Sequence, residues 1–396
     1  MVEEEKALLS KLVSSAQTRR EEASSLKDIL LANLVMVGET PSETFKEEKR
    51  VRFVLDRFRE AGLDKISSDE VNNALAVLPG KVGKRSILVC AHLDTLFEEG
   101  VDHTVTVGTE TVQGAGIADN SLGVAMLCSL PNVLQHCKVE LQSDLILMGA
   151  SRGLGRGDIQ GIDFFLEHHP GEVFAGVCIE GVDLGRLSYQ SIGMLRGEIT
   201  CRIPSGASRG AAHAGLGTIE PLAEVVRLIE QIPTPLRPLT TINLGALRAG
   251  TSFHQTATKG SLRFEVRSAQ VGMVATIQER LEEIVSKVAL ETGVELNLEI
   301  IARRRNGGIE FEHPLVRATR SVMEELGVKP EVRPSVGELS SLISRDIPGV
   351  TLGLTESCEA EEGKEGVRIE PLFSGVAQLV TMLQAIDAGV CDGQEE

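Results

Sequence analysis

The sequence has no tryptophan, a single tyrosine and few aromatic residues, which make up 3% of its 396 positions. Hydrophobic residues nevertheless account for 42% of the chain, so its cores must be built from aliphatic side chains. A paired-cysteine motif is also missing, because the seven cysteines are dispersed and include no Cys-x-x-Cys. This usage predicts small buried core thiols, among them Cys90, Cys128 and Cys178, in a reducing, cytoplasmic setting.

The chain also lacks an excess of basic residues and an apolar leader. Its formal charge of −17 argues against binding to a nucleic-acid backbone, which requires clustered Lys and Arg. The charged N-terminal segment has no signal-peptide core, and no apolar run approaches the roughly 20 residues that span a bilayer. We therefore expect neither nucleic acid nor a membrane as a partner. The length is sufficient for two domains with full cores.

Continuously apolar segments alternate with amphipathic ones over the first 190 residues. Helices are expected over residues 3–36 and 42–62, and a third is expected to open at Asp119 and Asn120. Buried strands are expected at 85–95, 144–150 and 173–181. Apolar strands that alternate with helices indicate an α/β fold whose mixed, mostly parallel sheet is covered by helices on both faces.

The pattern changes near residue 190. From there to residue 302, half-exposed strands and amphipathic helices follow in β-α-β-β-α-β order, which is typical of an α+β open-faced sandwich. After residue 302 the first pattern returns, with a helix, a short strand and a long apolar helix. We therefore predict one α/β domain in two pieces, residues 1–189 and 303–396, with a smaller domain, residues 190–302, inserted into it.

The loop "GASRGLGRGDIQG" after the apolar strand admits three interpretations. A phosphate-binding loop is disfavoured because the Walker ending G-K-[ST] is missing. A nucleophilic serine elbow at Ser151 would need a helix immediately afterwards, which the three glycines over 153–157 make improbable, together with a downstream histidine such as His254. The third interpretation, a metal centre, depends on polar residues elsewhere in the chain.

Polar side chains stand at the ends of the predicted strands. His92 and Asp94 close the first strand in "HLDT", Asp119 caps a helix in "GAGIADN", and Glu180 closes another strand in "CIEG". Taken singly, a capping aspartate and a strand-end histidine have ordinary structural explanations. Taken together, they are expected to meet at the edge where α/β sheets hold their sites, and imidazole with carboxylate is a metal-ligating set.

These motifs, in this order, resemble the two-zinc exopeptidase family that includes peptidase T, carboxypeptidase G and aminoacylase. The similar segments are "AHLDT", "GAGIADNSLGVA", "GLGRGDIQG", the run from "IEGVDLGR" to "GEITCRI", and "EGVRIEPLFSG". The resemblance covers nearly the whole chain and implies a zinc-exopeptidase-like α/β domain with an inserted lid and dimerisation domain. It also implies a homodimer formed through that inserted domain.

The resemblance assigns roles to residues of this sequence. It places His92, Asp119 and Glu180 at the ligands of the first zinc ion, with Asp94 as the acid that orients the histidine. In the inserted domain, "AGTSFHQTATKGSLRFEVRS" resembles the stretch that supplies an asparagine and an arginine to the substrate. Here those positions hold His254 and Arg267, so Arg267 is expected to bind a ligand carboxylate through its planar fork.

The remaining family positions are altered. The family's Glu-Glu pair, general base and then second-zinc ligand, falls on Ser151 and Arg152, and the final histidine ligand falls near Glu361. A serine hydroxyl is not a useful base near neutral pH, and arginine does not bind zinc. One hypothesis is that Arg152 pairs with Asp119 and Glu361 and replaces the charge of the second metal. The other is that Arg152 points to solvent.

Two functions follow from these assignments. In the first, the protein binds one zinc ion at most and a small peptide or acylamino-acid ligand, but hydrolyses peptide or amide bonds weakly or not at all. In the second, it is an active one-zinc peptidase or acylamino-acid amidohydrolase. Its base is then a glutamate of the acidic segment "ESCEAEEGKE", residues 356–365, which we call the acidic loop. Both use the same three ligands: His92, Asp119 and Glu180.

Overall fold

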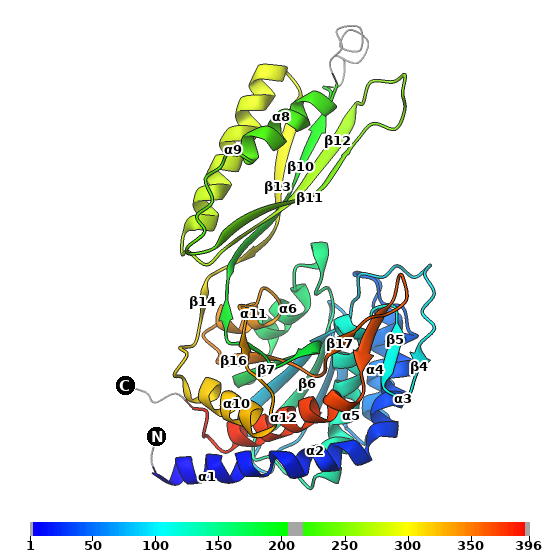
Figure 1. Cartoon of the computed structure of the whole chain (residues 1–396), viewed down its shortest axis with the longest axis vertical. Helices are drawn as coiled ribbons and strands as arrows, with labels where there is room; N and C mark the ends of the chain where they lie inside the picture. Colours follow the sequence, from blue (N-terminus) through cyan, green and yellow to red (C-terminus); the bar gives the residue numbers. More distant parts are fainter. Residues whose placement is uncertain (1–2, 205–216, 393–396) are drawn as a thin grey trace. The chain divides into compact units, whose positions relative to one another are not determined.

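The computed structural model describes residues 3–204 and 217–392. Two compact units divide the chain: unit 1 is Met1–Ser191 with Gly307–Glu396, and unit 2 is Ile192–Asn306 (Figure 1). The sequence predicted an inserted domain over residues 190–302, and unit 2 runs over residues 192–306. The first unit is therefore assembled from two distant parts of the chain.

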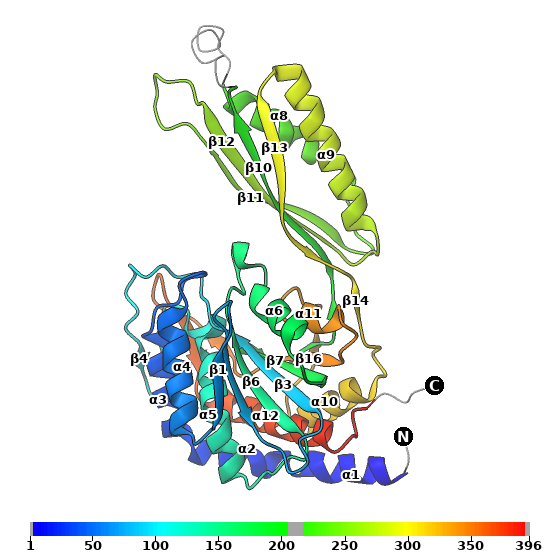
Figure 2. The same cartoon turned by 180° about the vertical axis from the view of Figure 1, so that it is seen from behind.

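Unit 1 is built around an eight-stranded mixed sheet whose central strands run parallel. The strand order is β1-β2-β6-β3-β7-β16-β8-β15. Figure 2 labels β1, β6, β3, β7 and β16 of this sheet. The pairs β3–β6, β3–β7 and β7–β16 are parallel, whereas β2–β6 and β8–β16 are antiparallel. The bounds are β1 Lys65–Ser68, β2 Ala74–Leu78, β3 Ser86–His92, β6 Asp144–Ala150, β7 Val173–Leu184, β8 Arg186–Ser188, β15 Glu331–Val332 and β16 Gly349–Gly353.

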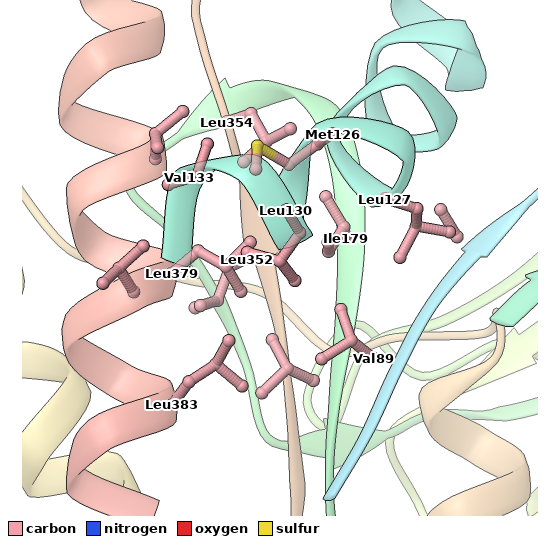
Figure 3. Close-up of a cluster of buried hydrophobic side chains, with 14 of the residues drawn as sticks. Val89, Met126, Leu127, Leu130, Val133, Ile179, Leu352, Leu354, Leu379 and Leu383 are labelled. Carbon is pink, nitrogen blue, oxygen red and sulfur yellow. The ribbon is translucent and has the colours of Figure 1, made fainter. Parts of the chain in front are cut away.

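Helices cover both faces of this sheet, as the continuously apolar strands predict. One face packs on α5 (Leu122–His136) and α12 (Glu370–Asp387), where Val89, Leu130 and Leu379 belong to one buried cluster (Figure 3). The other face packs on α6 (Gln160–His168) and α11 (Leu339–Ile343). The α10 helix (Pro314–Glu325) and short β9 (Gln190–Ser191) and β14 (Gly307–Gly308) complete this part of the unit. Burial of each such aliphatic side chain stabilises the folded state by about 1.5–3 kcal/mol relative to leaving it exposed.

The Ile117–His136 segment is long and apolar enough to cross a membrane by length and composition, and 89% of its apolar stretch is buried inside the structure. The expectation that no apolar run approaches this length is therefore wrong for this segment. Its burial between strands and helices explains the composition, because a core helix needs apolar residues on every side.

The N-terminal region differs from the two helices expected there. Residues 3–38 form three helices, α1 Glu3–Ser14, α2 Ala16–Ser25 and α3 Lys27–Gly38. The next helix, α4 (Glu48–Glu60), begins later than residue 42. Residues 42 and 43 pair instead with the chain after β3. Thr95 N donates to Ser42 O at 2.7 Å, and Glu43 forms an isolated β-bridge with Thr95. This backbone pairing with the chain after β3 outweighs the local helical pattern.

A second, small sheet in unit 1 was not expected from the sequence. It has the order β17-β18-β5-β4 and includes the ends of the acidic loop. Its strands are β4 Thr106–Val107, β5 Thr111–Gly114, β17 Ser357–Cys358 and β18 Glu365–Arg368. These strands are two to four residues long, too short for a sequence pattern to reveal.

Arg50 is a fully buried arginine that fixes the end of β3. Its Nη1 donates to Leu93 O at 3.0 Å, and its Nη2 donates to Val37 O at 3.0 Å and to Thr40 O at 2.6 Å. The guanidinium thus joins the C-terminal turn of α3 to the residue after His92. Burial lowers the pKa of Arg50 to about 9, against the raising effect of the Asp94 charge.

Unit 2 is the α+β sandwich that the sequence predicts. Its antiparallel sheet has the order β11-β12-β10-β13, and α8 and α9 pack on one face around Leu195, Ile199 and Leu281. Polar and charged side chains alternate onto the other face of the strands. The bounds are β10 Gly193–Arg202, α8 Ile219–Ile229, β11 Thr240–Ala249, β12 Lys259–Ser268, α9 Met273–Thr292 and β13 Glu295–Arg304.

Candidate metal centre

Three predicted ligands meet at the carboxyl end of the central strands. Cys90 of β3 pairs with Cys178 of β7, so His92 and Glu180, each two residues further on, point to the same side of neighbouring strands. Asp119 comes from the turn Ile117–Ser121 that leads into α5. Glu365, at the start of β18, holds this turn because its Oε2 accepts from Ala118 N at 2.9 Å and Asp119 N at 3.1 Å.

The distances among these side chains fit a single metal ion. His92 Nε2 lies 2.9 Å from Asp119 Oδ1 and 4.0 Å from Glu180 Oε2, and one ligand atom of each residue lies within 4.8 Å of the others. His92 Nδ1 lies 2.9 Å from the main-chain oxygen of Asp94. Because a carbonyl only accepts, Nδ1 carries the proton in this contact, and Nε2 is left as the metal-binding atom. One nitrogen and two carboxylates suit zinc.

Asp94 is buried, but it holds a loop more closely than it holds the histidine. Its carboxylate accepts from Thr44 Oγ1 at 2.7 Å, Gly153 N at 3.0 Å and Leu154 N at 2.8 Å. The Asp94 Oδ1 atom lies 3.5 Å from His92 Nδ1, whereas the main-chain oxygen of Asp94 lies 2.9 Å from the same nitrogen. The expected orientation of His92 therefore comes chiefly from the Asp94 backbone, and the carboxylate fixes the 153–154 loop against the site.

The protonation of the cluster is set by burial and by its own charges. Burial alone would lower the pKa of His92, but hydrogen bonds to Asp119 and Asp94 and the Glu338 charge hold it well above its usual value. Burial would raise the pKa of Asp119, and the contact with His92 lowers it instead. Burial raises the pKa of Glu180 to about 7, against the lowering effects of His92 and Arg186. Protons therefore occupy places that a metal ion would take.

Two residues near the cluster were missed from the sequence. Arg186 of β8 places Nη1 3.5 Å from Glu180 Oε1. Glu338, immediately before α11, is 7% exposed, and its Oε1 lies 3.1 Å from the position that a Cβ on Gly153 would take. That same position is 2.8 Å from His92 Cβ, so Glu338 lies against the loop beside His92. Arg186 ends the segment "IEGVDLGR", to which the resemblance assigned no role beyond Glu180, and Glu338 stands in none of the quoted segments. Long-range packing brings both residues to the site.

Ser151 lies at the end of β6 and does not face a histidine. It is fully buried, its Oγ donates to Val71 O at 2.5 Å, and its N donates to Asn73 Oδ1 at 2.9 Å. The hydroxyl therefore fastens the chain near residue 71, and the serine-nucleophile interpretation has no support in this geometry. The position expected for the family's general base holds a structural serine.

Arg152 does not make the predicted pairing with Asp119 and Glu361. Within the described part of the chain, its Nη1 donates to Gln160 Oε1 at 3.3 Å and its guanidinium lies 5.6 Å from the Phe45 ring centre. Its backbone has a φ of 54°, and its N donates to Glu47 Oε1 at 2.8 Å. The left-handed turn and the Glu47 contact together set the direction of the side chain. The charge-replacement hypothesis for Arg152 is wrong.

Glu361, near which the resemblance places the family's last histidine, is exposed at the small sheet. It pairs with Lys364 at 3.1 Å, and its side chain is 74% exposed. Four residues later, Glu365 reaches the Asp119 turn through its carboxylate. The pKa of Glu365 is raised, because burial outweighs the lowering effect of the hydrogen bonds from the backbone of Ala118 and Asp119. The second metal position therefore has no ligand from Arg152, and Glu361 is engaged with Lys364.

The two predicted substrate residues belong to unit 2. Arg267 of β12 donates through Nε to Glu265 Oε1 at 2.6 Å, and its side chain is 46% exposed. Glu265 also pairs with Arg196 at 2.6 Å. His254 is exposed, and its Nδ1 lies 3.1 Å from Ser252 Oγ. Arg267 thus already has a carboxylate partner on its own strand, and its role toward a ligand stays a prediction.

Comparisons with known proteins bear on the fold. Residues 73–151 match the model of peptidase family M28, and no curated protein matches the chain. Three similar solved structures are peptidases. Aminopeptidase PepT from Bacillus cereus is 17% identical with a TM-score of 0.68, over 91% of this chain and 98% of that one. The dipeptidase Dug1p from Saccharomyces cerevisiae is 12% identical with a TM-score of 0.76, over 95% of this chain and 99% of that one.

The third similar structure is a dinuclear metal-binding peptidase of the M20 family from Bacillus subtilis. It is 14% identical with a TM-score of 0.63, over 92% of this chain and 98% of that one. These likenesses extend over both units of the chain, and the family match covers β3, the Asp119 turn and β6. The chain therefore has the fold of these peptidase structures, one of which is described as a member of the M20 family. The resemblance predicted from its motifs is confirmed, as is the predicted α/β fold with an inserted α+β domain.

Proposed function

We propose that the protein is a metallopeptidase relative that binds one zinc ion and a small carboxylate ligand, and hydrolyses peptide or amide bonds weakly or not at all. The ligand class is a short peptide or an acylamino acid. The observation that carries this proposal is the Ser151 hydroxyl, which is buried and donates to Val71 O where a catalytic carboxylate is expected. A cytoplasmic location belongs to the proposal and accords with seven free cysteines.

The donor set of the cluster supports the metal part of this proposal. His92 Nε2, Asp119 and Glu180 would hold the ion, and the Asp119 side chain is 46% exposed, so the site is open to a ligand. A bound zinc ion polarises a carbonyl oxygen and lowers the pKa of a bound water. The chain's own residues must then accept the proton of that water. Loss of a general base typically lowers the rate by roughly 10²–10⁴-fold.

The test combines metal content, binding and turnover. Elemental analysis after dialysis is expected to find at most one zinc per chain, and dipeptides and N-acetylated amino acids are expected to bind without rapid hydrolysis. Arg267→Ala is expected to weaken that binding by about tenfold, since it removes a bidentate partner for the carboxylate. Two retained zinc ions, or fast dipeptide hydrolysis that EDTA abolishes, would contradict the proposal.

Glu338 favours a second candidate function, an active one-zinc hydrolase. Its buried carboxylate lies against the Gly153 backbone beside His92, and it belongs to an element far from Ser151 in sequence. A carboxylate there is a candidate base for a metal-bound water. In this case Glu338→Gln is expected to lower kcat by roughly 10²–10⁴-fold with unchanged zinc content. Absence of EDTA-sensitive turnover in the wild-type protein would exclude this candidate.

A further inference from the structure

Arg186 is the cation that contacts a predicted metal ligand in the described part of the chain. Its Nη1 lies 3.5 Å from Glu180 Oε1, whereas Glu180 Oε2 faces His92 Nε2 at 4.0 Å. The two oxygens of one carboxylate thus face two different groups. One oxygen is directed to the metal-binding cluster, and the other is directed to a guanidinium.

The fold fixes this contact on both sides. After Glu180 the chain crosses the end of β16, where Leu354 N donates to Glu180 O at 3.0 Å, and returns as β8 antiparallel to β16. The turn passes through Gly185 with a φ of 100°, directly before Arg186. Arg186 Nε donates to the Oγ of fully buried Ser188 at 3.1 Å. The guanidinium is therefore held at the cluster by its own strand.

The charge of Arg186 reaches beyond Glu180. It also acts on the Asp119 carboxylate, whose pKa is lowered first by the contact with His92, against burial, and to a smaller extent by Arg186. The Arg186 side chain is 20% exposed, and its hydrogen bonds among the described side chains include Nε to Ser188. A permanent cation that remains partly open to solvent thus lies beside the predicted ligand Glu180.

We propose that Arg186 supplies the fixed positive charge that a second metal ion supplies in a two-metal centre. The site then holds one dication and presents the Arg186 Nη2 group to an oxyanion of the ligand. This inference rests on the proposed function, because it assumes the single metal ion at His92, Asp119 and Glu180. It assigns to Arg186 the role that the sequence suggested for Arg152.

The proposal has two consequences of opposite sign. A guanidinium repels a dication and competes with it for Glu180, so removing the charge strengthens zinc binding. The same guanidinium attracts an oxyanion, so removing it weakens binding of a carboxylate ligand. An arginine that only orients Glu180 would behave differently, because loss of an orienting partner weakens metal binding by about 10–100-fold.

The experiment compares Arg186→Gln with the wild-type protein by titration with zinc and then with N-acetylglycine. Zinc is expected to bind about tenfold more tightly to the variant, and N-acetylglycine about tenfold more weakly to the zinc-loaded variant. Arg186→Lys, which keeps the charge, is expected to restore zinc affinity to near the wild-type value. Titration with inorganic phosphate in parallel shows whether the effect extends from carboxylates to other oxyanions.

Arg333→Gln is the matched control. Arg333 directly follows β15, the strand next to β8. It pairs with Asp183 at 3.0 Å and Glu331 at 2.5 Å, and its side chain is 50% exposed. The Arg333→Gln variant loses the same charge without touching Glu180, so its affinities for zinc and for N-acetylglycine are expected to stay unchanged.

Unchanged or weaker zinc binding by Arg186→Gln would overturn the Arg186 proposal and leave the proposed function intact. If the wild-type protein binds no zinc, the metal part of the proposed function fails, and the Arg186 proposal, which assumes that ion, fails with it.

Discussion

At the level of single residues, the cluster carries protons that a metal ion must displace. Burial raises the pKa of Glu180 to about 7, against the effects of His92 and Arg186. The pKa of His92 is also raised, because its contacts with Asp119 and Asp94 outweigh burial. Both groups thus bind a proton more tightly in the folded protein than in the unfolded chain.

The first prediction follows from these two raised pKa values. Zinc affinity is expected to rise with pH through about 7, and zinc binding is expected to release protons, since Glu180 and His92 must be deprotonated to act as ligands. Calorimetry in buffers of different ionisation enthalpy counts the released protons. Zinc affinity that stays constant between pH 6 and pH 8 would contradict the assignment of these ligands.

The same shifts set the stability of the metal-free protein. A group whose folded pKa is raised contributes stability that is present at low pH and lost as the pH rises through the folded value. For Glu180 that window runs from its ordinary value of 4.5 to about 7. The metal-free protein should therefore lose stability over this range, and bound zinc should reverse the loss.

The sequence was informative about residues that end strands or cap helices. His92, Asp119 and Glu180 could be named because each ends a strand or opens a helix, and parallel strands bring such ends to one edge. Arg152 was misassigned because its left-handed backbone, with a φ of 54°, redirects the side chain. Arg186 was missed because its place depends on the crossing of β16, which no local pattern encodes.

At the level of elements, the long apolar strands and helices were predictable and the short elements were not. The strand ending in "AHLDT" and the helix after Asp119 have enough apolar residues to define a period, and both are present as β3 and α5. The β8 strand has three residues, Arg186–Ser188, and supplies a cation to the site. The start of α4 at Glu48 is likewise set by tertiary contacts of residues 42 and 43.

Arg50 provides the prediction at this scale. Its guanidinium joins α3 and α4 to the end of β3 through main-chain oxygens of Val37, Thr40 and Leu93. Arg50→Met removes these donors and deprives the buried Leu93 carbonyl of its guanidinium partner, so the free energy of unfolding is expected to fall by about 3 kcal/mol. Urea denaturation measures this change.

Arg52→Met is the control for Arg50→Met. Arg52 lies two residues further along α4, and its side chain is exposed. The control variant loses the same charge and gains the same side chain, and its stability is expected to change by less than about 0.5 kcal/mol. Equal stability of the two variants would show that the buried guanidinium does not stabilise the end of β3.

At the level of the whole molecule, we predict a homodimer formed through unit 2. β11 is an edge strand of its sheet, and an unpaired edge is a template for pairing with a second chain. Sedimentation at micromolar concentration is expected to show a dimer. Leu247, on β11, is 52% exposed, so Leu247→Glu should shift the equilibrium toward the monomer by opposing two like charges.

Leu290→Glu supplies the control for this prediction. Leu290 lies on α9 of the same unit and is 86% exposed, so the variant gains the same charge away from β11. Dimerisation is expected to be unaffected by it. A monomeric wild-type protein, or equal behaviour of the two variants, would count against pairing through the β11 edge.

The short pair of β9 and β14 has a consequence for the evolution of the inserted unit. Gly307 pairs with Ser191 and Gly308 with Gln190, so the points where the chain leaves and re-enters unit 1 lie side by side. A tight two-residue turn would join them into an ordinary β-hairpin. Residues 192–306 are in this sense inserted at the tip of a hairpin, and after their removal a short turn is enough to rejoin the chain. Gain or loss of the whole module thus requires no rearrangement of the sheet that carries His92.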